Sequence, residues 1–355
     1  MSFARPKSLV LEEGCADSPL AQQILRACPE VPLTMLPSAD RVEAPRHCWI
    51  LRRHRGRFLK PCPGTRNYLC CGYRVLNLVH GCPFGCAYCI LQDYLENQGI
   101  TIFVNLEEAF QEVRQFLARS RGIIRIGTGE LADSLALEPW LGLGERLVPF
   151  FRDLPGGMLE LKTKSAHVGP LLDLPHGGHT VISWSLNPPP VIRRAEAGTP
   201  SLEQRLEAAQ RCQQRGYPLA LHFDPLVMTE GWEDQYRELV RRVFRNLDPR
   251  SILWVSLGAL RYPPSLHERI LSCGLGPEEI FPGLDGKSRY LRPLRTRMFE
   301  SMVRWLREMG GNDLFVYLCM ESPEVWQRAI GWIPRDTADL DARFQRRIHR
   351  FWQRQ

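Results

Sequence analysis

Three cysteines, Cys82, Cys86 and Cys89, are spaced as C-x3-C-x2-C in one short segment. Three thiolates on a compact loop can each bind one iron of a cubane 4Fe–4S cluster, which leaves the fourth iron without a protein ligand. The amino and carboxylate groups of S-adenosylmethionine can chelate such an open iron. One electron from the cluster then cleaves the sulfonium and releases a 5′-deoxyadenosyl radical. The spacing therefore predicts a 4Fe–4S cluster that binds S-adenosylmethionine.

A structural zinc ion is the alternative for these cysteines, with His80 or another cysteine as the fourth ligand. Zinc sites usually combine two closely spaced ligand pairs, and no second pair stands out in this sequence. His80 lies only two residues before Cys82, which is a tight bite for one tetrahedral ion. The cluster is therefore the favoured interpretation.

From Tyr73 onward, short apolar strands alternate with amphipathic helices, as in βα units around a parallel sheet. The strands are expected at residues 74–79, 123–126, 158–162, 180–184, 218–223 and 252–257. The helices are expected at residues 106–120, 202–214, 232–246 and 297–309. Six such strands are enough for a partial barrel, so the predicted fold class is α/β, with a TIM-like partial barrel.

In βα barrels the active site lies at the C-terminal ends of the strands. The cysteines follow the first predicted strand, and other polar or glycine-rich segments follow the next ones. These segments are Gly127-Thr128-Gly129-Glu130, then Lys164, then Ser185-Leu186-Asn187, and finally His222 with Asp224. We expect them to meet at one rim. A tight turn is the alternative for the glycines, and a structural anchor is the favoured role for Asp224.

Two smaller segments flank the barrel. Residues 1–60 are expected to form an N-terminal α/β extension. Residues 61–332 are assigned to the barrel with C-terminal additions, including a last strand at 314–319. Residues 333–355 are rich in arginine and aromatic residues and are expected to form a basic C-terminal helix or tail. A solvated amphipathic helix is favoured there over a nucleic-acid-binding arm.

The chain has 355 residues, a net charge of +7 and twelve cysteines. The positive charge suits an anionic partner. Neither a membrane-spanning apolar run nor a signal peptide is recognisable, so we expect no membrane partner and a cytoplasmic location. The cysteines are then expected to be reduced thiols. Cys62, Cys70 and Cys71 have no spacing typical of a metal site and are interpreted as buried or packing thiols, with a metal role as the alternative.

The C-x3-C-x2-C loop is the signature of the radical S-adenosylmethionine superfamily, and within it the chain resembles the spore photoproduct lyase family as a divergent member. The resembling pieces include GCPFGCAYC, KTK, SLN and EAGTP at residues 81–89, 162–164, 185–187 and 196–200. The resemblance implies a partial (β/α)6 barrel, a 4Fe–4S cluster, S-adenosylmethionine and carbon–carbon lyase activity on a thymine lesion in DNA. It also implies an electron donor such as flavodoxin or ferredoxin.

The resemblance also implies roles for single residues. Lys164 and Ser185 match residues that contact S-adenosylmethionine. Glu130 ends a segment that resembles the Gly-Gly-Glu motif near the amino group of this cofactor, where a carboxylate would accept a charge-assisted hydrogen bond. Tyr88 matches a radical-transfer tyrosine, so Tyr88 and Glu130 are expected to be catalytic. The expected cofactor-binding residues are Tyr88, Gly127, Thr128, Gly129, Glu130, Lys164, Ser185 and Asn187.

The chain departs from the lyase at two chemically specific positions. The lyase carries a hydrogen-donating cysteine after the second strand, whereas residues 127–134 contain none. The lyase also has a second tyrosine beside the third cluster cysteine, where this chain has Ile90. Cys319 is a candidate substitute for the hydrogen donor, although a small residue that fills the barrel is the favoured interpretation.

Family members insert a hairpin with an Arg-Tyr pair at the lesion, and residues 286–290 resemble it. We therefore expect Arg289 and Tyr290 to bind substrate, with Tyr290 as a wedge in the gap left by a flipped base. A solvated basic segment is the alternative. Damaged DNA, or another nucleic acid, is the expected partner. Two other interpretations stay open: the same chemistry on a non-DNA substrate, and a zinc-stabilised nucleic-acid-binding protein.

Overall fold

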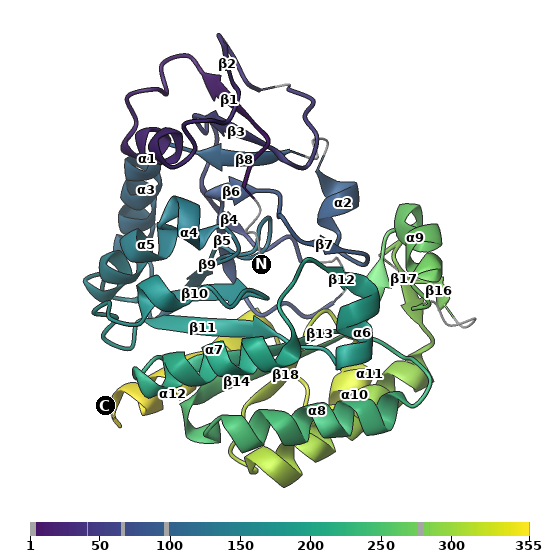
Figure 1. The fold of residues 1–355 in the computed structure, drawn as a ribbon. Helices are drawn as coiled ribbons and strands as arrows, with labels where there is room; N and C mark the ends of the chain where they lie inside the picture. Colours follow the sequence, from purple (N-terminus) through teal and green to yellow (C-terminus); the bar gives the residue numbers. More distant parts are fainter. Residues whose placement is uncertain are drawn as a thin grey trace.

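A curled eight-stranded sheet forms the centre of the computed structural model, which describes residues 5–40, 42–64, 68–95, 99–275, 280–283 and 285–354 (Figure 1). Its strand order is β18-β14-β13-β11-β10-β9-β5-β4. All neighbours are parallel except β4 and β5. The strands are β4 (Leu59–Pro61), β5 (Arg74–Leu76), β9 (Ile124–Gly127), β10 (Gly157–Thr163), β11 (Thr180–Ser185), β13 (Leu219–Leu226), β14 (Ile252–Ala259) and β18 (Val316–Leu318).

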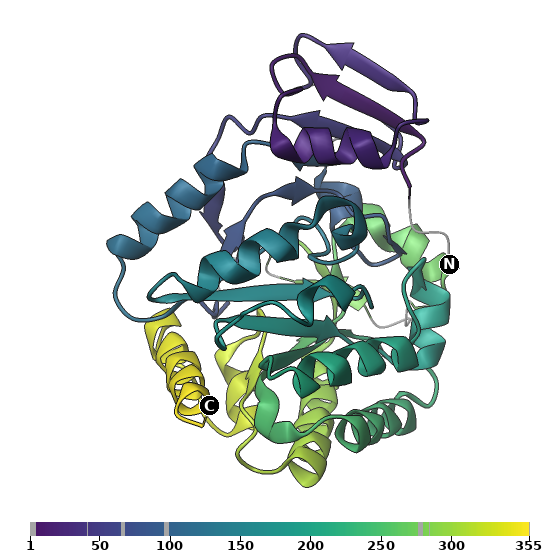
Figure 2. The same cartoon turned by 60° about the vertical axis from the view of Figure 1, so that its left-hand side comes forward.

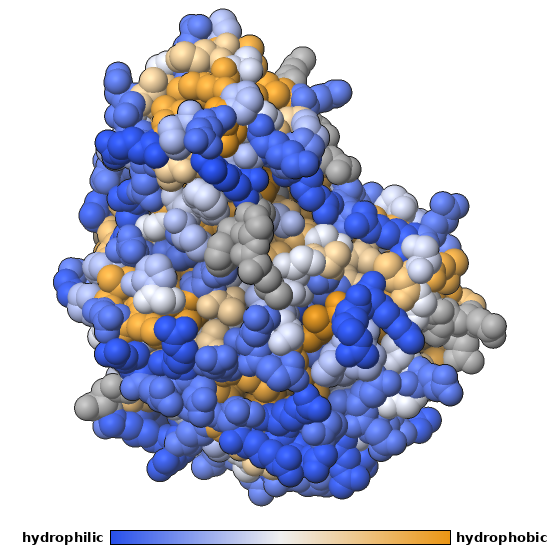
Figure 3. Space-filling model, viewed as in Figure 1, coloured by the Kyte–Doolittle hydropathy of each residue, from blue (hydrophilic) through white to orange (hydrophobic). Residues whose placement is uncertain are grey.

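Amphipathic helices cover the outer face of this sheet. On α8 the apolar Trp232, Tyr236 and Val243 are buried, whereas Arg237 is exposed, which gives the helix one face for the core and one for water. The outward surface over these helices is largely hydrophilic at the bottom of Figure 3. The helices are α3 (Leu106–Ala118), α4 (Glu138–Leu141), α5 (Leu143–Arg152), α6 (Pro189–Ala195), α7 (Leu202–Gln214), α8 (Trp232–Asn246), α10 (Arg292–Gly310) and α11 (Pro323–Ile330).

The predicted strands and helices of the barrel are present, with ends shifted by a few residues, except at the first strand. The prediction of one strand over residues 74–79 is wrong in its second half. After β5 the chain leaves the barrel sheet, and β6 (Val79–His80) pairs antiparallel with β8 in a different sheet. Residues 75–79 are all buried, so the pattern of apolar residues in this segment does not show where one sheet ends and the other begins.

The N-terminal segment builds a second sheet, with the order β2-β1-β3-β8-β6. Its other elements are β1 (Ser8–Glu12), α1 (Pro19–Ala27), β2 (Leu33–Leu36), β3 (Cys48–Arg52) and β8 (Ile100–Phe103). Figure 2 shows this sheet at the top of the molecule, with α1 against it. Because β6 and β8 come from beyond residue 60, the sheet is not confined to the predicted extension. The domain boundaries at residues 60 and 332 stay predictions.

The basic C-terminal segment forms the helix α12 (Thr337–Trp352). Leu340, Phe344, Ile348 and Phe351 are buried on its inner face, which packs against β14. The guanidinium of Arg125 on β9 lies 3.5 Å from the centre of the Phe344 ring. The helix is therefore amphipathic, as predicted, and its apolar face is part of the core.

A small antiparallel sheet with the order β15-β17-β16 lies beside the barrel with α9. These elements are β15 (Arg261–Tyr262), α9 (His267–Ser272), β16 (Ile280–Pro282) and β17 (Ser288–Tyr290). No helix in the described part of the chain has the length and apolar character needed to span a membrane.

Candidate active site

The cysteine loop is held by backbone hydrogen bonds on two sides. It begins at Gly81, which has a φ of +96° and whose amide donates to the Leu131 carbonyl oxygen at 2.8 Å. A Cβ at Gly81 would lie 3.1 Å from the Gly99 carbonyl oxygen, so both the backbone conformation and the space favour glycine. Further on, β7 (Gly85–Cys86) pairs antiparallel with β12 (Glu196–Ala197). The loop is thus fixed between the segments that follow β9 and α6.

The thiols of Cys82, Cys86 and Cys89 line one cavity of about 490 Å³. Cys86 is buried, and the other two are half-buried. Burial raises the pKa of Cys82, and it raises that of Cys86 to about 12 although Lys164 opposes the shift. Thiols in this setting become thiolates when a metal cation binds them. Three such thiols around one cavity fit a cluster of iron ions.

A single-ion site is not formed at this loop. Among the residues that the structure describes, no three His, Cys, Asp or Glu side chains form a group that could hold one metal ion. A cubane cluster places each thiolate on a different iron, so its cysteines need not converge on one point. Cys82, Cys86 and Cys89 are the residues that would hold the cluster.

Behind the loop, Tyr88 belongs to a buried hydrogen-bond network. Its hydroxyl donates to Glu196, and Asn187 Nδ2 donates to the same carboxylate at 2.9 Å. Arg205 binds the other carboxylate oxygen at 2.5 Å, and both side chains of this ion pair are 0% exposed. Burial alone would raise the pKa of Glu196, but the charges of Arg205 and Lys164 outweigh it and lower that pKa. Glu196 is therefore a carboxylate that orients Tyr88.

The segment after β9 brings Glu130 to the cavity. A Cβ at Gly127 would lie 1.7 Å from the Tyr73 hydroxyl, and one at Gly129 would lie 2.7 Å from Lys162 Cβ. Neither glycine has a positive φ, so these positions require glycine for space and not for a left-handed turn. Glu130 Oε1 lies 3.6 Å from Lys162 Nζ. Burial lowers the pKa of Lys162, but the charges of Glu130 and Asp224, with smaller contributions from other groups, together outweigh it and the net shift is upward.

The predicted cofactor-binding residues fall into two groups. Those that line the cavity with the cysteines are Tyr88, Gly129, Glu130, Lys164 and Ser185. Gly127, Thr128 and Asn187 are not in its described lining; the Thr128 hydroxyl donates to Ser134 at 2.8 Å. Contact of either group with S-adenosylmethionine stays a prediction.

Asp133 is a supporting residue that sequence reasoning missed. Its carboxylate accepts hydrogen bonds from the Thr163 hydroxyl at 2.6 Å and from the Lys164 amide at 2.7 Å. It also accepts from the amides of Leu135 and Ala136 at 3.0 and 2.9 Å. Asp133 thus fixes the end of β10 against the loop after β9. The only signal in the sequence is its place within the glycine-rich segment.

Arg289 and Tyr290 lie on β17 and are 3% and 1% exposed. Arg289 pairs with Asp285 at 2.5 Å, and its guanidinium lies 4.6 Å from the centre of the Tyr68 ring. The Tyr290 hydroxyl accepts a hydrogen bond from the Met228 amide at 2.8 Å. In this conformation both side chains are structural, and Tyr290 does not present a wedge at the surface. Their role in substrate binding stays a prediction.

Asp224 is anchored by Arg261 through two hydrogen bonds of 3.0 and 3.1 Å, as the structural interpretation of this aspartate predicts. Burial raises the pKa of Asp224, but Arg261, together with Lys162 and His222, outweighs burial and the pKa is about 2. Arg261 also lies 3.6 Å from Cys319 Sγ. Cys319 is absent from the described lining of the cavity, whereas Cys62 is part of it. Cys62 lies well before the cysteine motif in the sequence, and nothing in its position indicated that it would line this cavity.

Known proteins resemble this chain in sequence and in fold. The family model described as "Spore photoproduct lyase" matches residues 71–259, just over half of the chain. The spore photoproduct lyase of Clostridium acetobutylicum is 24% identical over 265 residues, which cover 69% of this chain and 76% of that protein. The enzyme of Bacillus subtilis is 32% identical over 165 residues, which cover 46% and 48%.

Solved structures give the same picture for the fold. A spore photoproduct lyase variant with bound AdoMet and dinucleoside spore photoproduct has a TM-score of 0.78 and 22% identity, and the match covers 90% of this chain and 100% of that chain. The curled sheet and the cysteine loop, together with the family match, define the class as a radical S-adenosylmethionine enzyme. Within this class, the chain belongs to the spore photoproduct lyase family.

Proposed function

We propose that the chain holds a 4Fe–4S cluster on Cys82, Cys86 and Cys89 and uses S-adenosylmethionine to repair a thymine lesion in DNA. The observation that carries the proposal is that the three thiols line the same cavity as Glu130 and Lys164. When bound, the cluster and S-adenosylmethionine supply a 5′-deoxyadenosyl radical that abstracts hydrogen from the substrate. The protein binds and orients these groups and excludes water.

Four residues of the cavity have roles in this proposal. Glu130 accepts a hydrogen bond from the ammonium of S-adenosylmethionine, a charge-assisted contact. Lys164 and Ser185 contact the same molecule from the ends of β10 and β11. Tyr88 stays a neutral phenol, because burial and the charge of Glu196 both raise its pKa. Its hydroxyl proton is thereby held on the side that faces Glu196.

The strand arrangement supports the finer description of the fold as a partial (β/α)6 barrel. β5, β9, β10, β11, β13 and β14 form six adjacent parallel strands, to which β18 and β4 are added at the two edges. In this interpretation the site lies at the carboxyl ends of the strands, where βα barrels carry their chemistry.

The substrate and partners complete the proposal. A related structure holds a dinucleoside spore photoproduct, which supports a dinucleotide lesion as the substrate class. A one-electron donor such as flavodoxin or ferredoxin supplies the reducing electron. None of the twelve cysteines forms a disulfide, which supports a reducing, cytoplasmic compartment.

A second candidate function is the same radical chemistry on a different substrate. The observation that favours it is the lack of a cysteine in residues 127–134, where the lyase carries its hydrogen donor. Without that thiol, the product radical of the spore lesion must take its hydrogen from another source. Product analysis with a lesion-bearing oligonucleotide separates the two candidates, because only the first yields two intact thymines.

The first experiment is an anaerobic assay of S-adenosylmethionine cleavage. The protein is loaded with iron and sulfide and reduced with dithionite, and 5′-deoxyadenosine is measured by chromatography. We expect the wild-type protein to form it and a variant with Cys82, Cys86 and Cys89 all changed to alanine to form none. A protein that contains zinc without iron after anaerobic purification, or a reduced cluster protein that is inactive even with the lesion present, would refute the proposal.

A further inference from the structure

A second cavity of about 400 Å³ adjoins the cysteine cavity. Its described lining comes from β3, β4 and β8 and from the segments that follow β5 and β9. Four residues line both cavities: Pro63, Tyr94, Glu130 and Leu131. A polymer bound in the first cavity can therefore continue into the second.

Two polar atoms of this lining are buried without a hydrogen-bond partner in the part of the chain that the structure describes, namely Asn77 Oδ1 and His80 Nε2. Asn77 is only 3% exposed. A buried acceptor of this kind costs stability unless a bound molecule donates a hydrogen bond to it. Asn77 therefore fits a ligand that donates an N–H.

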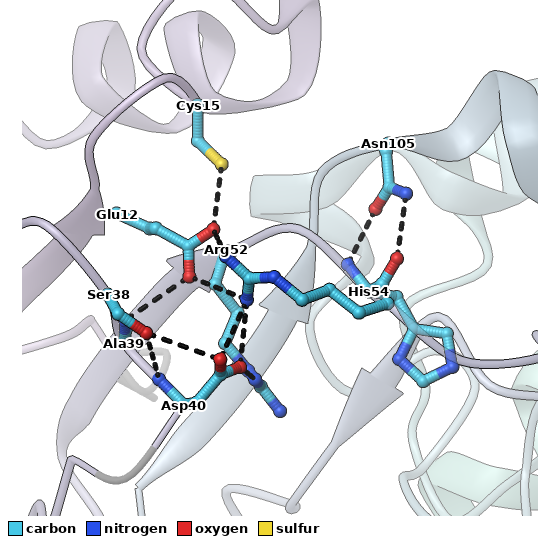
Figure 4. Close-up of polar contacts among 9 residues, drawn as sticks. Glu12, Cys15, Ser38, Ala39, Asp40, Arg52, His54 and Asn105 are labelled. Carbon is cyan, nitrogen blue, oxygen red and sulfur yellow. Dashed lines mark hydrogen bonds and ion pairs between the residues drawn. The ribbon is translucent and has the colours of Figure 1, made fainter.

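Lys60 supplies a positive charge that no described residue of the protein neutralises in an ion pair. It is exposed, and among the described residues no carboxylate forms an ion pair with it. Arg52 differs, because it pairs with Asp40, which also binds Arg55 at 2.8 Å. Figure 4 shows the Asp40 carboxylate between Ser38 and the Arg52 side chain. Among the described residues that line this cavity, the cationic side chain left to bind an anion is therefore Lys60.

Tyr94 offers an exposed aromatic face where the two cavities meet. It is the last residue of α2 (Leu91–Tyr94) and is 60% exposed. Aromatic side chains beside cationic ones are the usual platforms on which bases of a single strand stack. The junction thus presents a flat apolar surface close to a positive charge.

We propose that the second cavity is a subsite for the nucleotide that flanks the lesion in a DNA strand. The choice of DNA rests on the proposed function. A nucleotide carries the three complementary groups: a phosphate for Lys60, a base N–H for Asn77 Oδ1 and a planar base for the Tyr94 ring. The subsite recognises the strand next to the reacting bases and takes no part in the radical chemistry.

The test is an anaerobic binding measurement with the cluster-loaded protein and S-adenosylmethionine. The probes are a dinucleoside spore photoproduct, the same lesion with one thymidylate on each side, and thymidine 5′-monophosphate. We expect the flanked lesion to bind roughly tenfold tighter than the unflanked one. Lys60→Gln and Tyr94→Leu are each expected to bring this ratio toward one. Arg237→Gln, on the exposed face of α8, is the matched charge control and keeps the ratio.

Each other outcome overturns the subsite. Equal affinities for the flanked and unflanked lesions, or a ratio that Lys60→Gln leaves unchanged, would show that the cavity binds no flanking nucleotide. Binding of the monophosphate that depends on Lys60, without any gain from flanking, would identify a free nucleotide as the ligand. Failure of the proposed function gives a different result, because the wild-type protein would then bind no unflanked lesion and form no 5′-deoxyadenosine; this overturns both proposals.

Discussion

Asn187 and Asn77 are both buried beside a cavity, yet their hydrogen bonding differs. Asn187 is 1% exposed, donates to Glu196 and lies 3.3 Å from the Tyr88 hydroxyl, while its Oδ1 accepts from the Tyr236 hydroxyl at 2.8 Å. Asn77 is 3% exposed, and its Oδ1 has no partner within the described chain. The first asparagine completes a structural network. The second has an acceptor that no described residue satisfies.

This difference extends to the two cavities as a whole. Behind the cysteine cavity, Glu196 and Arg205 neutralise each other and hold Tyr88 in place before any cofactor binds. In the adjoining cavity, Lys60 and Asn77 have no such partners among the described residues. A wall that must position reactive groups is stabilised by internal bonds, because those groups cannot be allowed to move. A recognition surface can leave its polar groups to the ligand.

The largest effect on stability is expected when one partner of the buried ion pair behind the cysteine cavity is removed. Arg205→Met leaves the Glu196 carboxylate buried and unpaired, which should lower the free energy of unfolding by about 3–5 kcal/mol. Urea unfolding measures this loss. Arg242→Met is the matched control: Arg242 pairs with Glu203 at 2.8 Å, but both are exposed, so a loss below about 1 kcal/mol is expected. Equal losses of unfolding free energy in the two variants would show that the buried ion pair contributes no more to stability than the exposed one.

The pH dependence of stability tests a second charged group of the same wall. Burial raises the pKa of Asp224, but Arg261, together with Lys162 and His222, lowers it from 3.8 to about 2. Because the folded-state pKa is the lower one, this stabilisation is present above pH 3.8 and is lost as the pH falls toward 2. The shift corresponds to about 2 kcal/mol.

The measurement compares the unfolding free energy of the metal-free protein at pH 5 and pH 2. In Asp224→Asn, the difference in unfolding free energy between pH 5 and pH 2 should be smaller by about 2 kcal/mol, since an amide does not titrate in this range. Asp173→Asn is the control, because Asp173 is exposed and its ion pair with Arg215 is screened by solvent. An unchanged pH dependence in Asp224→Asn would show that Asp224 is not the titrating group.

Tyr290→Phe separates a structural tyrosine from a substrate wedge. The variant keeps the ring and removes the oxygen that accepts from the Met228 amide. We expect a loss of about 1 kcal/mol in unfolding free energy, typical of one hydrogen bond, with unchanged affinity for lesion DNA. Thermal unfolding and a binding titration check the two parts. Weaker DNA binding at unchanged stability would instead support the wedge.

The features that sequence reasoning predicted well are local ones. The C-x3-C-x2-C spacing lies within one loop, and α8 is bounded by its apolar pattern, so neither depends on distant residues. The features that it missed depend on long-range pairing. Asp133 binds Thr163 and Lys164 on a distant segment, and the second half of the first predicted strand joins β8 because of sheet geometry.

The burial of Arg289 and Tyr290 was missed for a related reason. A basic residue in a turn-rich segment usually indicates a solvated surface, and its sequence does not show that Asp285 is placed to neutralise it. The same limit applies to Lys60. Its lack of a partner among the described residues is a property of the folded chain, and only the structure distinguishes it from the paired Arg52.

The smallest expected effect is the change in stability caused by replacing Asn77 with leucine. It is also the most discriminating, because the same replacement of Asn187 is expected to change stability in the opposite direction. Asn77→Leu removes an acceptor that has no partner, so stability should stay the same or rise by about 1 kcal/mol. Asn187→Leu, the matched variant, should lower it by about 2 kcal/mol or more, since the bonds to Glu196 and Tyr236 are lost. Urea unfolding of both variants without DNA gives the comparison. If Asn77→Leu destabilised the protein as much as Asn187→Leu, then Asn77 would be a structural residue, and the second cavity would lose its main hydrogen-bond acceptor for a base.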